Sequence, residues 1–149
     1  MNYIYVQGKL TEVSSGGISI FDRSFKFGDG IFETALVANG KIYDWQSHQE
    51  RMEDGLKYFK LDVDVSRAGE LATELLKRNN ITEGYIRIVI SRGDSAGVVG
   101  YKVGVAKPYM VITTIAKPLP KFSSAKLFLS PKSHQQRDNS ARFLCPWTL

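Results

Sequence analysis

The chain has 149 residues, 43% of them hydrophobic and 23% charged, which is typical of a globular protein and excludes a mostly disordered one. Its apolar runs, such as residues 109–116, are far shorter than the roughly 20 residues that span a bilayer, and residues 1–8 carry no secretory-signal pattern. The single cysteine, Cys145, excludes an internal disulfide and favours a cytoplasmic location. The net charge of +5 is scattered, so we expect neither a nucleic-acid nor a membrane partner.

The first third of the chain predicts strands and tight turns. Apolar residues on either side of Gly8 predict a short hairpin over residues 4–10. Residues 31–37 predict a strand because they are rich in β-branched and aromatic side chains. Asn39-Gly40 is a strong turn signal and predicts a returning strand over residues 41–45.

Two amphipathic helices are expected next. Ser47 is a favourable N-cap, and the glutamate three residues later completes a capping box, which predicts a helix over residues 47–59. Either Asp64 or Ser66 would cap a second helix, with leucines at helical spacing along its buried side. Residues 79–80, both asparagine, would end it.

The remaining elements are strands. Residues 85–91 predict a strand with three isoleucines on one face, and residues 109–115 predict a second buried strand. A glycine-rich loop over residues 93–104 separates the two. A short strand is predicted over residues 127–129.

The order of strands, two helices and strands predicts an α+β domain on a mostly antiparallel sheet, and not a doubly wound parallel one. Proline, lysine and serine gather at residues 117–124, which favours a boundary there. We therefore expect a small N-terminal domain over residues 1–120. Residues 121–149 would form a linker and the start of a truncated second domain.

One segment carries more than fold information. Asp22-Arg23 is followed by Gly28-Asp29-Gly30 and then by Phe32-Glu33. The glycines permit backbone conformations that are closed to other residues, although Gly-Asp-Gly alone is typical of an ordinary turn. The glycine spacing and lysine of the nucleotide-binding loops are missing.

With the Asn39-Gly40 turn and the sequence His48-Gln49-Glu50-Arg51, this order resembles the opening of the class IV, or fold-type IV, pyridoxal-phosphate enzymes. That class includes D-amino-acid and branched-chain aminotransferases and aminodeoxychorismate lyase. The resemblance implies the small N-terminal domain of that fold and pyridoxal 5'-phosphate as cofactor. It also implies a small amino-acid-like substrate and a homodimer or other self-association.

By this resemblance, Arg51 corresponds to the arginine that binds the cofactor phosphate. A guanidinium offers a planar fork of donors to a phosphate, which gives the assignment a physical basis. The alternative is an exposed helix charge that pairs with Glu50 or Glu53. We expect His48 to pack or hydrogen-bond locally and expect no metal site, because no second ligand stands at useful spacing.

The resemblance also implies four substrate-binding residues: Phe32, Arg87, Arg92 and Tyr101. Arg92 matches a position that holds a substrate carboxylate in D-amino-acid transaminases, and Arg87 one that branched-chain enzymes use. An arginine that points outward from a strand is also commonly just solvent-facing. Thr34 resembles lyase-like and D-amino-acid-type members, so the choice between transamination and elimination stays open, with a slight preference for the lyase.

The lysine that forms the Schiff base with the cofactor would be expected near Cys145 to Leu149, yet the last lysine is Lys132. We therefore expect no catalytic residue in this chain, and an N-terminal fragment that is inactive by itself. Two alternatives remain open: a non-catalytic dimerisation or ligand-binding domain, and a basic nucleic-acid-binding module.

Overall fold

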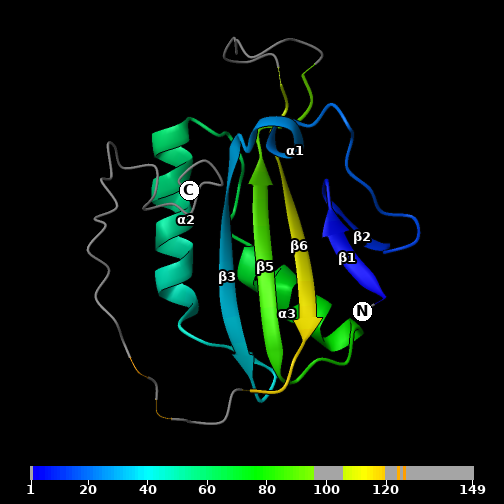
Figure 1. Cartoon of the computed structure of the whole chain (residues 1–149), viewed down its shortest axis with the longest axis vertical. Helices are drawn as coiled ribbons and strands as arrows, with labels where there is room; N and C mark the ends of the chain where they lie inside the picture. Colours follow the sequence, from blue (N-terminus) through cyan, green and yellow to red (C-terminus); the bar gives the residue numbers. More distant parts are fainter. Residues whose placement is uncertain (1, 96–105, 120–123, 125, 127–149) are drawn as a thin grey trace.

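The computed structural model describes residues 2–95, 106–119, 124 and 126. Its strands form one sheet in the order β2-β1-β6-β5-β3-β4, with every neighbouring pair antiparallel (Figure 1). The strands are β1 (Tyr3–Val6), β2 (Lys9–Glu12), β3 (Gly30–Ala38), β4 (Lys41–Ile42), β5 (Gly84–Ser91) and β6 (Tyr109–Ala116). The helices are α1 (Arg23–Phe27), α2 (Trp45–Phe59) and α3 (Ala68–Arg78). This confirms the predicted α+β domain on an antiparallel sheet.

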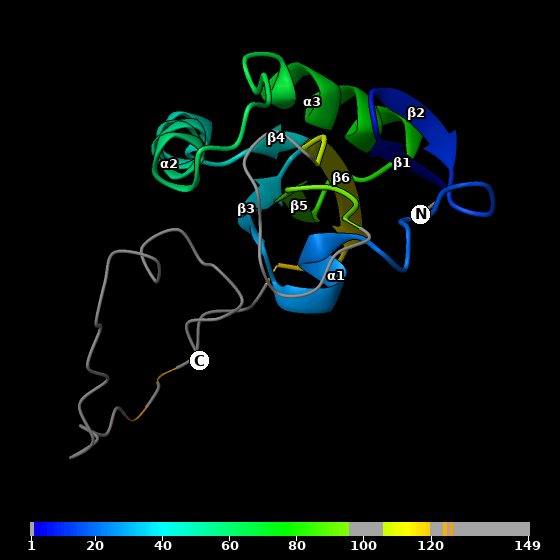
Figure 2. The same ribbon diagram turned by 90° about the horizontal axis from the view of Figure 1, so that it is seen from above.

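The sheet has one covered and one open face. The long helices α2 and α3 lie along one face, whereas the short α1 lies on the other side (Figure 2) and near one end of the strands (Figure 1). Successive side chains of β5 point to opposite faces of the sheet, so they alternate between buried and more exposed positions. Ile86, Ile88 and Ile90 are at most 1% exposed and belong to the core under the helices, while Arg87 between them is exposed. The core is therefore one layer between the sheet and the two helices.

The turn at Asn39-Gly40 forms as predicted, with φ of 51° and 71°, and β4 pairs with the end of β3. The returning strand is shorter than expected, because it ends at Ile42. Asp44 adopts a left-handed conformation, and Trp45 already belongs to α2. The prediction of a strand to Trp45 was therefore wrong in its second half.

The helix caps also differ from the sequence prediction. α2 begins before Ser47, whose hydroxyl donates to Asp44 Oδ1 at 2.9 Å and caps no backbone amide. α3 begins at Ala68, and Asp64 instead accepts a hydrogen bond from the backbone N of Ser66 in the turn before it. The predicted end of this helix is confirmed, because Asn79 is its C-cap.

Some predictions lie outside the described residues. The strand expected over residues 127–129 and most of the loop at 93–104 belong to this group. The division into domains at residue 120 stays a prediction. Within the described residues, none of the helices has the length and apolar character that crossing a membrane requires.

Candidate functional site

Glu33 is a buried carboxylate of β3 that binds two side chains of α2. Its side chain is 4% exposed. Arg51 donates to both of its oxygens, from Nε at 2.6 Å and from Nη2 at 2.5 Å, and Nδ1 of His48 lies 2.8 Å from Oε2. A carboxylate removed from water needs such partners, because burying an unpaired charge is costly. Glu33 therefore fixes Arg51 to the sheet, and the expected local hydrogen-bonding role of His48 is confirmed.

Arg51 keeps one accessible corner of its guanidinium, the Nη1 nitrogen. Its side chain is 35% exposed, and Nη1 has no polar partner among the described residues. The hydrogen bond to Glu33 raises the pKa of Arg51 above its usual value, although burial acts in the opposite direction. Arg51 is thus a permanently charged donor that pairs with Glu33 and not with Glu50 or Glu53 of its own helix.

This corner fits a phosphate group in its chemistry. A guanidinium that is already oriented loses little freedom when an anion binds, and its N–H donors match phosphate oxygens. Glu33 neutralises part of the charge, so Arg51 by itself would bind phosphate weakly. Donors from outside the described residues would have to complete a strong site.

Phe32 and Arg87 lie together on the open face of the sheet. Cζ of Arg87 stands 4.2 Å from the centroid of the Phe32 ring. In the strand register, Arg87 is opposite Thr34 on β3 and Thr113 on β6. Three strands therefore present a guanidinium between two threonines and over an aromatic ring, which suits recognition of a carboxylate.

The two groups of residues lie on opposite faces of the sheet. Phe32 and Glu33 are neighbours in β3, so their side chains point to opposite sides. β4 pairs only with Val37 and Ala38, which leaves the earlier part of β3 as a sheet edge in the described structure. A ligand that contacts both Arg51 and Phe32 would have to reach around this edge.

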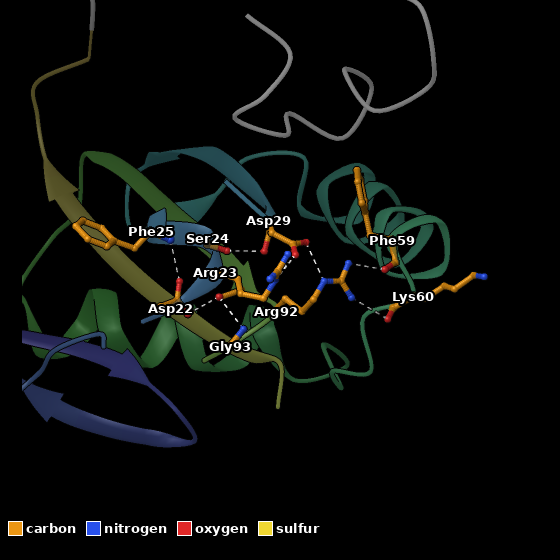
Figure 3. A network of polar contacts seen from close by, with 10 residues as sticks. Asp22, Arg23, Ser24, Phe25, Asp29, Phe59, Lys60, Arg92 and Gly93 are labelled. Carbon is orange, nitrogen blue, oxygen red and sulfur yellow. Dashed lines mark hydrogen bonds and ion pairs between the residues drawn. The ribbon is translucent and has the colours of Figure 1, made fainter. Parts of the chain in front are cut away.

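The Gly-Asp-Gly loop forms a polar network with α1 and the end of β5 (Figure 3). Asp29 accepts hydrogen bonds from Nε of Arg23 at 2.7 Å and from Nε of Arg92 at 2.8 Å. Its backbone carbonyl accepts from the hydroxyl of Ser24 at 2.8 Å. A Cβ at Gly30 would collide with the carbonyl oxygen of Ile90 and with Ser24 Oγ, so this position requires glycine.

Arg92, predicted to bind substrate, is 7% exposed. Besides Asp29, its guanidinium contacts two backbone carbonyls at the end of α2, with Nη2 donating to Phe59 at 2.9 Å and Nη1 to Lys60 at 3.4 Å. These contacts favour a role inside the fold, and its substrate role stays a prediction. Tyr101, the fourth predicted substrate residue, lies outside the described residues.

Asp22 has a role that the sequence analysis missed. It is 1% exposed and accepts hydrogen bonds from Ser91 Oγ at 2.5 Å, from the hydroxyl of Tyr109 at 2.7 Å and from the backbone N of Phe25 at 2.9 Å. Burial and the hydrogen bond to Asp22 raise the pKa of Tyr109. One sequence signal could have indicated this role: Asp22 directly precedes the residues of α1, and aspartate is a favoured N-cap.

Comparison with known proteins gives one consistent result. The sequence profile of class IV aminotransferases matches residues 30–144. A protein of Methanocaldococcus jannaschii with the provisional name branched-chain-amino-acid aminotransferase is 32% identical over 120 residues, covering 78% of this chain and 40% of that protein. The D-alanine aminotransferase of Staphylococcus aureus (strain MSSA476) is 35% identical over 95 residues, covering 62% of this chain and 34% of the enzyme.

Solved structures show the same fold. The branched-chain amino acid aminotransferase of Escherichia coli superposes with a TM-score of 0.68 at 20% identity, over 78% of this chain and 40% of that one. The 4-amino-4-deoxychorismate lyase of Pseudomonas aeruginosa gives a TM-score of 0.63 at 23% identity, over 77% and 40%. At these identities the likeness shows the fold alone. The chain spans 40% of the length of the Methanocaldococcus jannaschii protein and 34% of the Staphylococcus aureus enzyme. It spans 41% of the D-alanine aminotransferase of Staphylococcus epidermidis, another curated relative.

Proposed function

The chain belongs to the family of class IV aminotransferases, and we propose that it supplies phosphate-holding and substrate-facing residues of a pyridoxal 5'-phosphate enzyme. The enzyme would be an aminotransferase or an aminodeoxychorismate lyase. The observation that carries the proposal is the placement of Arg51, which Glu33 orients and which keeps an accessible corner. When bound, pyridoxal phosphate acts as an electron sink that stabilises negative charge on the substrate.

Arg51 would hold the cofactor phosphate. Its Nε and Nη2 are occupied by Glu33, so the phosphate would contact Nη1 at the exposed side. Glu33 and His48 limit the rotamers of Arg51 before any ligand arrives, which lowers the entropy cost of binding.

Phe32 and Arg87 would face the substrate, a small amino-acid-like molecule. The Phe32 ring lies against the guanidinium of Arg87, and Thr34 adds a hydroxyl in the same row. A carboxylate could bind Arg87 from the open side, because Arg87 is exposed. This arrangement supports recognition of a substrate carboxylate.

We propose further that the protein is cytoplasmic and self-associates, as a homodimer. The single cysteine supports a reducing compartment. Large apolar side chains are exposed in α1 and just before it, with Ile20 at 70%, Phe21 at 54% and Phe25 at 67%. Neighbouring exposed apolar residues of this size favour contact with another protein surface.

The test is a titration of the full chain with pyridoxine 5'-phosphate and with pyridoxine. Neither has the aldehyde that would react with surface lysines, so the difference in their affinities isolates the phosphate. We expect the phosphorylated compound to bind more tightly, and Arg51→Gln to remove that preference. Arg67→Gln, which removes a charge that is 72% exposed on the surface, should keep it. Equal affinities in the unaltered chain, or a preference that survives Arg51→Gln, would refute the proposal.

A further inference from the structure

We propose that Arg92 is a positioning residue, which holds the end of α2 against the Gly-Asp-Gly loop and thereby sets where Arg51 stands. The inference rests on the proposed phosphate role of Arg51. It assigns to Arg92 a task inside the protein in place of the predicted contact with a substrate carboxylate.

The guanidinium of Arg92 bridges a side chain and a helix end (Figure 3). Nε donates to Asp29 Oδ1, while Nη2 and Nη1 donate to the carbonyls of Phe59 and Lys60. The last carbonyls of a helix lack partners within the helix and carry partial negative charge, so a cation is favourable there. Arg92 therefore joins α2 to the loop by directional bonds that only a fork of donors provides.

Asp29 makes this connection rigid. The same carboxylate also binds Nε of Arg23, and the carbonyl of Asp29 accepts from the backbone N of Arg92 at 3.2 Å. The side chains of Arg23, Arg92 and Asp29 are only 6%, 8% and 18% exposed. Water therefore competes little for these bonds, and each charge depends on its protein partners.

The two anchors of α2 originate from one short segment of the chain. Asp29 reaches the end of α2 through Arg92, and Glu33, four positions later, binds Arg51 directly. Arg51 precedes Phe59 by eight positions (59 − 51), which corresponds to about 12 Å along the helix. A helix held at two such points cannot slide or tilt freely, so loss of the Arg92 anchor should loosen the geometry of Arg51 and Glu33.

The experiment follows the Arg51 Nε–H signal in ¹⁵N NMR spectra of the full chain, which is assigned by its disappearance in Arg51→Lys. Arg92→Lys keeps a positive charge near Asp29 but cannot reach all three acceptors. We expect the Arg51 Nε–H to exchange with water about threefold faster or more in Arg92→Lys, and the preference for pyridoxine 5'-phosphate over pyridoxine to fall by a similar factor. The control Arg67→Lys should change neither quantity.

Circular dichroism checks that Arg92→Lys folds. If the folded variant exchanges its Arg51 Nε–H with water at the rate of the unaltered chain, the inference is overturned. If Arg92→Lys does not fold, Asp29→Asn tests the same anchor, because it removes the charge and replaces one of the two oxygens that accept from Arg23 and Arg92 with an NH₂ donor. The Arg51 Nε–H should again exchange faster with water, and an unchanged exchange rate would overturn the inference. If the unaltered chain shows no phosphate preference, the proposed function fails. The Arg51 signal then still decides whether Arg92 positions the helix, since it needs no ligand.

Discussion

Glu33 and Arg51 are joined by two hydrogen bonds, of 2.6 and 2.5 Å, which run from the middle of α2 into the interior of the molecule. One partner is 4% exposed and the other 35%, so the pair reaches from the core to the surface. The buried carboxylate depends on Arg51 and His48 for its hydrogen bonds. The residue proposed to bind phosphate is therefore also part of what holds α2 to the sheet.

Glu33→Gln should destabilise the protein. The amide offers one acceptor oxygen in place of two and points an N–H₂ group at the guanidinium. We expect the free energy of unfolding to fall by about 2 kcal/mol, the scale of losing a hydrogen bond to a charged group. Urea denaturation measures this. Glu70→Gln breaks a surface pair with Arg67 and should cost less than about 0.5 kcal/mol, and equal effects of the two changes would contradict the role of Glu33.

The hydroxyl of Tyr109 should make stability depend on pH in the alkaline range. Its pKa in the folded chain is raised above the usual 10.0 by burial and by Asp22. Above pH 10 the unfolded chain loses this proton while the folded chain keeps it, so the free energy of unfolding should fall as pH rises. Below pH 10 this contribution is fully present.

Tyr109→Phe should remove that part of the pH dependence. Other tyrosines and lysines titrate in the same range, so the quantity to compare is the difference between the unaltered chain and Tyr109→Phe in urea denaturation. We expect this difference to shrink from neutral pH to about pH 11. A constant difference would show that Tyr109 ionises at the same pH in both states.

The fold was largely predictable because its signals are local and periodic. The isoleucines of β5 and the turn at Asn39-Gly40 each depend on a few neighbouring residues. The start of α2 was placed too late because Ser47 has the sequence of an N-cap, whereas the left-handed Asp44 turns the chain earlier. Propensity alone does not reveal which of two nearby polar residues takes the unusual backbone conformation.

The site was predictable only in part. The motif suggested a phosphate-binding role for Arg51, which stays a prediction, but it did not indicate that Glu33 would orient this side chain, since their contact joins residues 18 positions apart. Arg92 shows the same limit more strongly, because its partners Asp29 and Phe59 come from two other elements. An arginine at a strand end has the same sequence pattern whether it faces a ligand or a helix terminus.

Gly30→Ala should disrupt the loop that carries Asp29. A Cβ at this position meets the carbonyl oxygen of Ile90 and the hydroxyl of Ser24, so the strand pairing or α1 has to shift. We expect a loss of about 2 kcal/mol in the free energy of unfolding, typical of overpacking at a buried backbone contact. Gly17→Ala is the matched control, because a Cβ there meets nothing within 4 Å. Equal stability of both variants in urea would show that the loop adapts without cost.

Asn79 should hold the first hairpin to α3. Its Oδ1 accepts from the backbone N of Asn2 and of Tyr3, and its Nδ2 donates to the carbonyl of Tyr3 and to Thr114 Oγ1, all at 2.9 Å. Asn79→Asp keeps the acceptor but places a negative charge against the Tyr3 carbonyl and at a helix C-terminus, where it is unfavourable. We expect a loss of about 2 kcal/mol in stability and faster amide exchange at Tyr3.

Asn80→Asp makes the same charge change one position later. Asn80 is exposed, and aspartate tolerates its left-handed conformation of φ 53°. This variant should therefore change stability by less than about 0.5 kcal/mol and leave exchange at Tyr3 unaltered. Because both variants carry the added charge near the end of α3, a difference between them isolates the hydrogen bonds of Asn79. Equal losses would instead assign the effect to charge at the helix end.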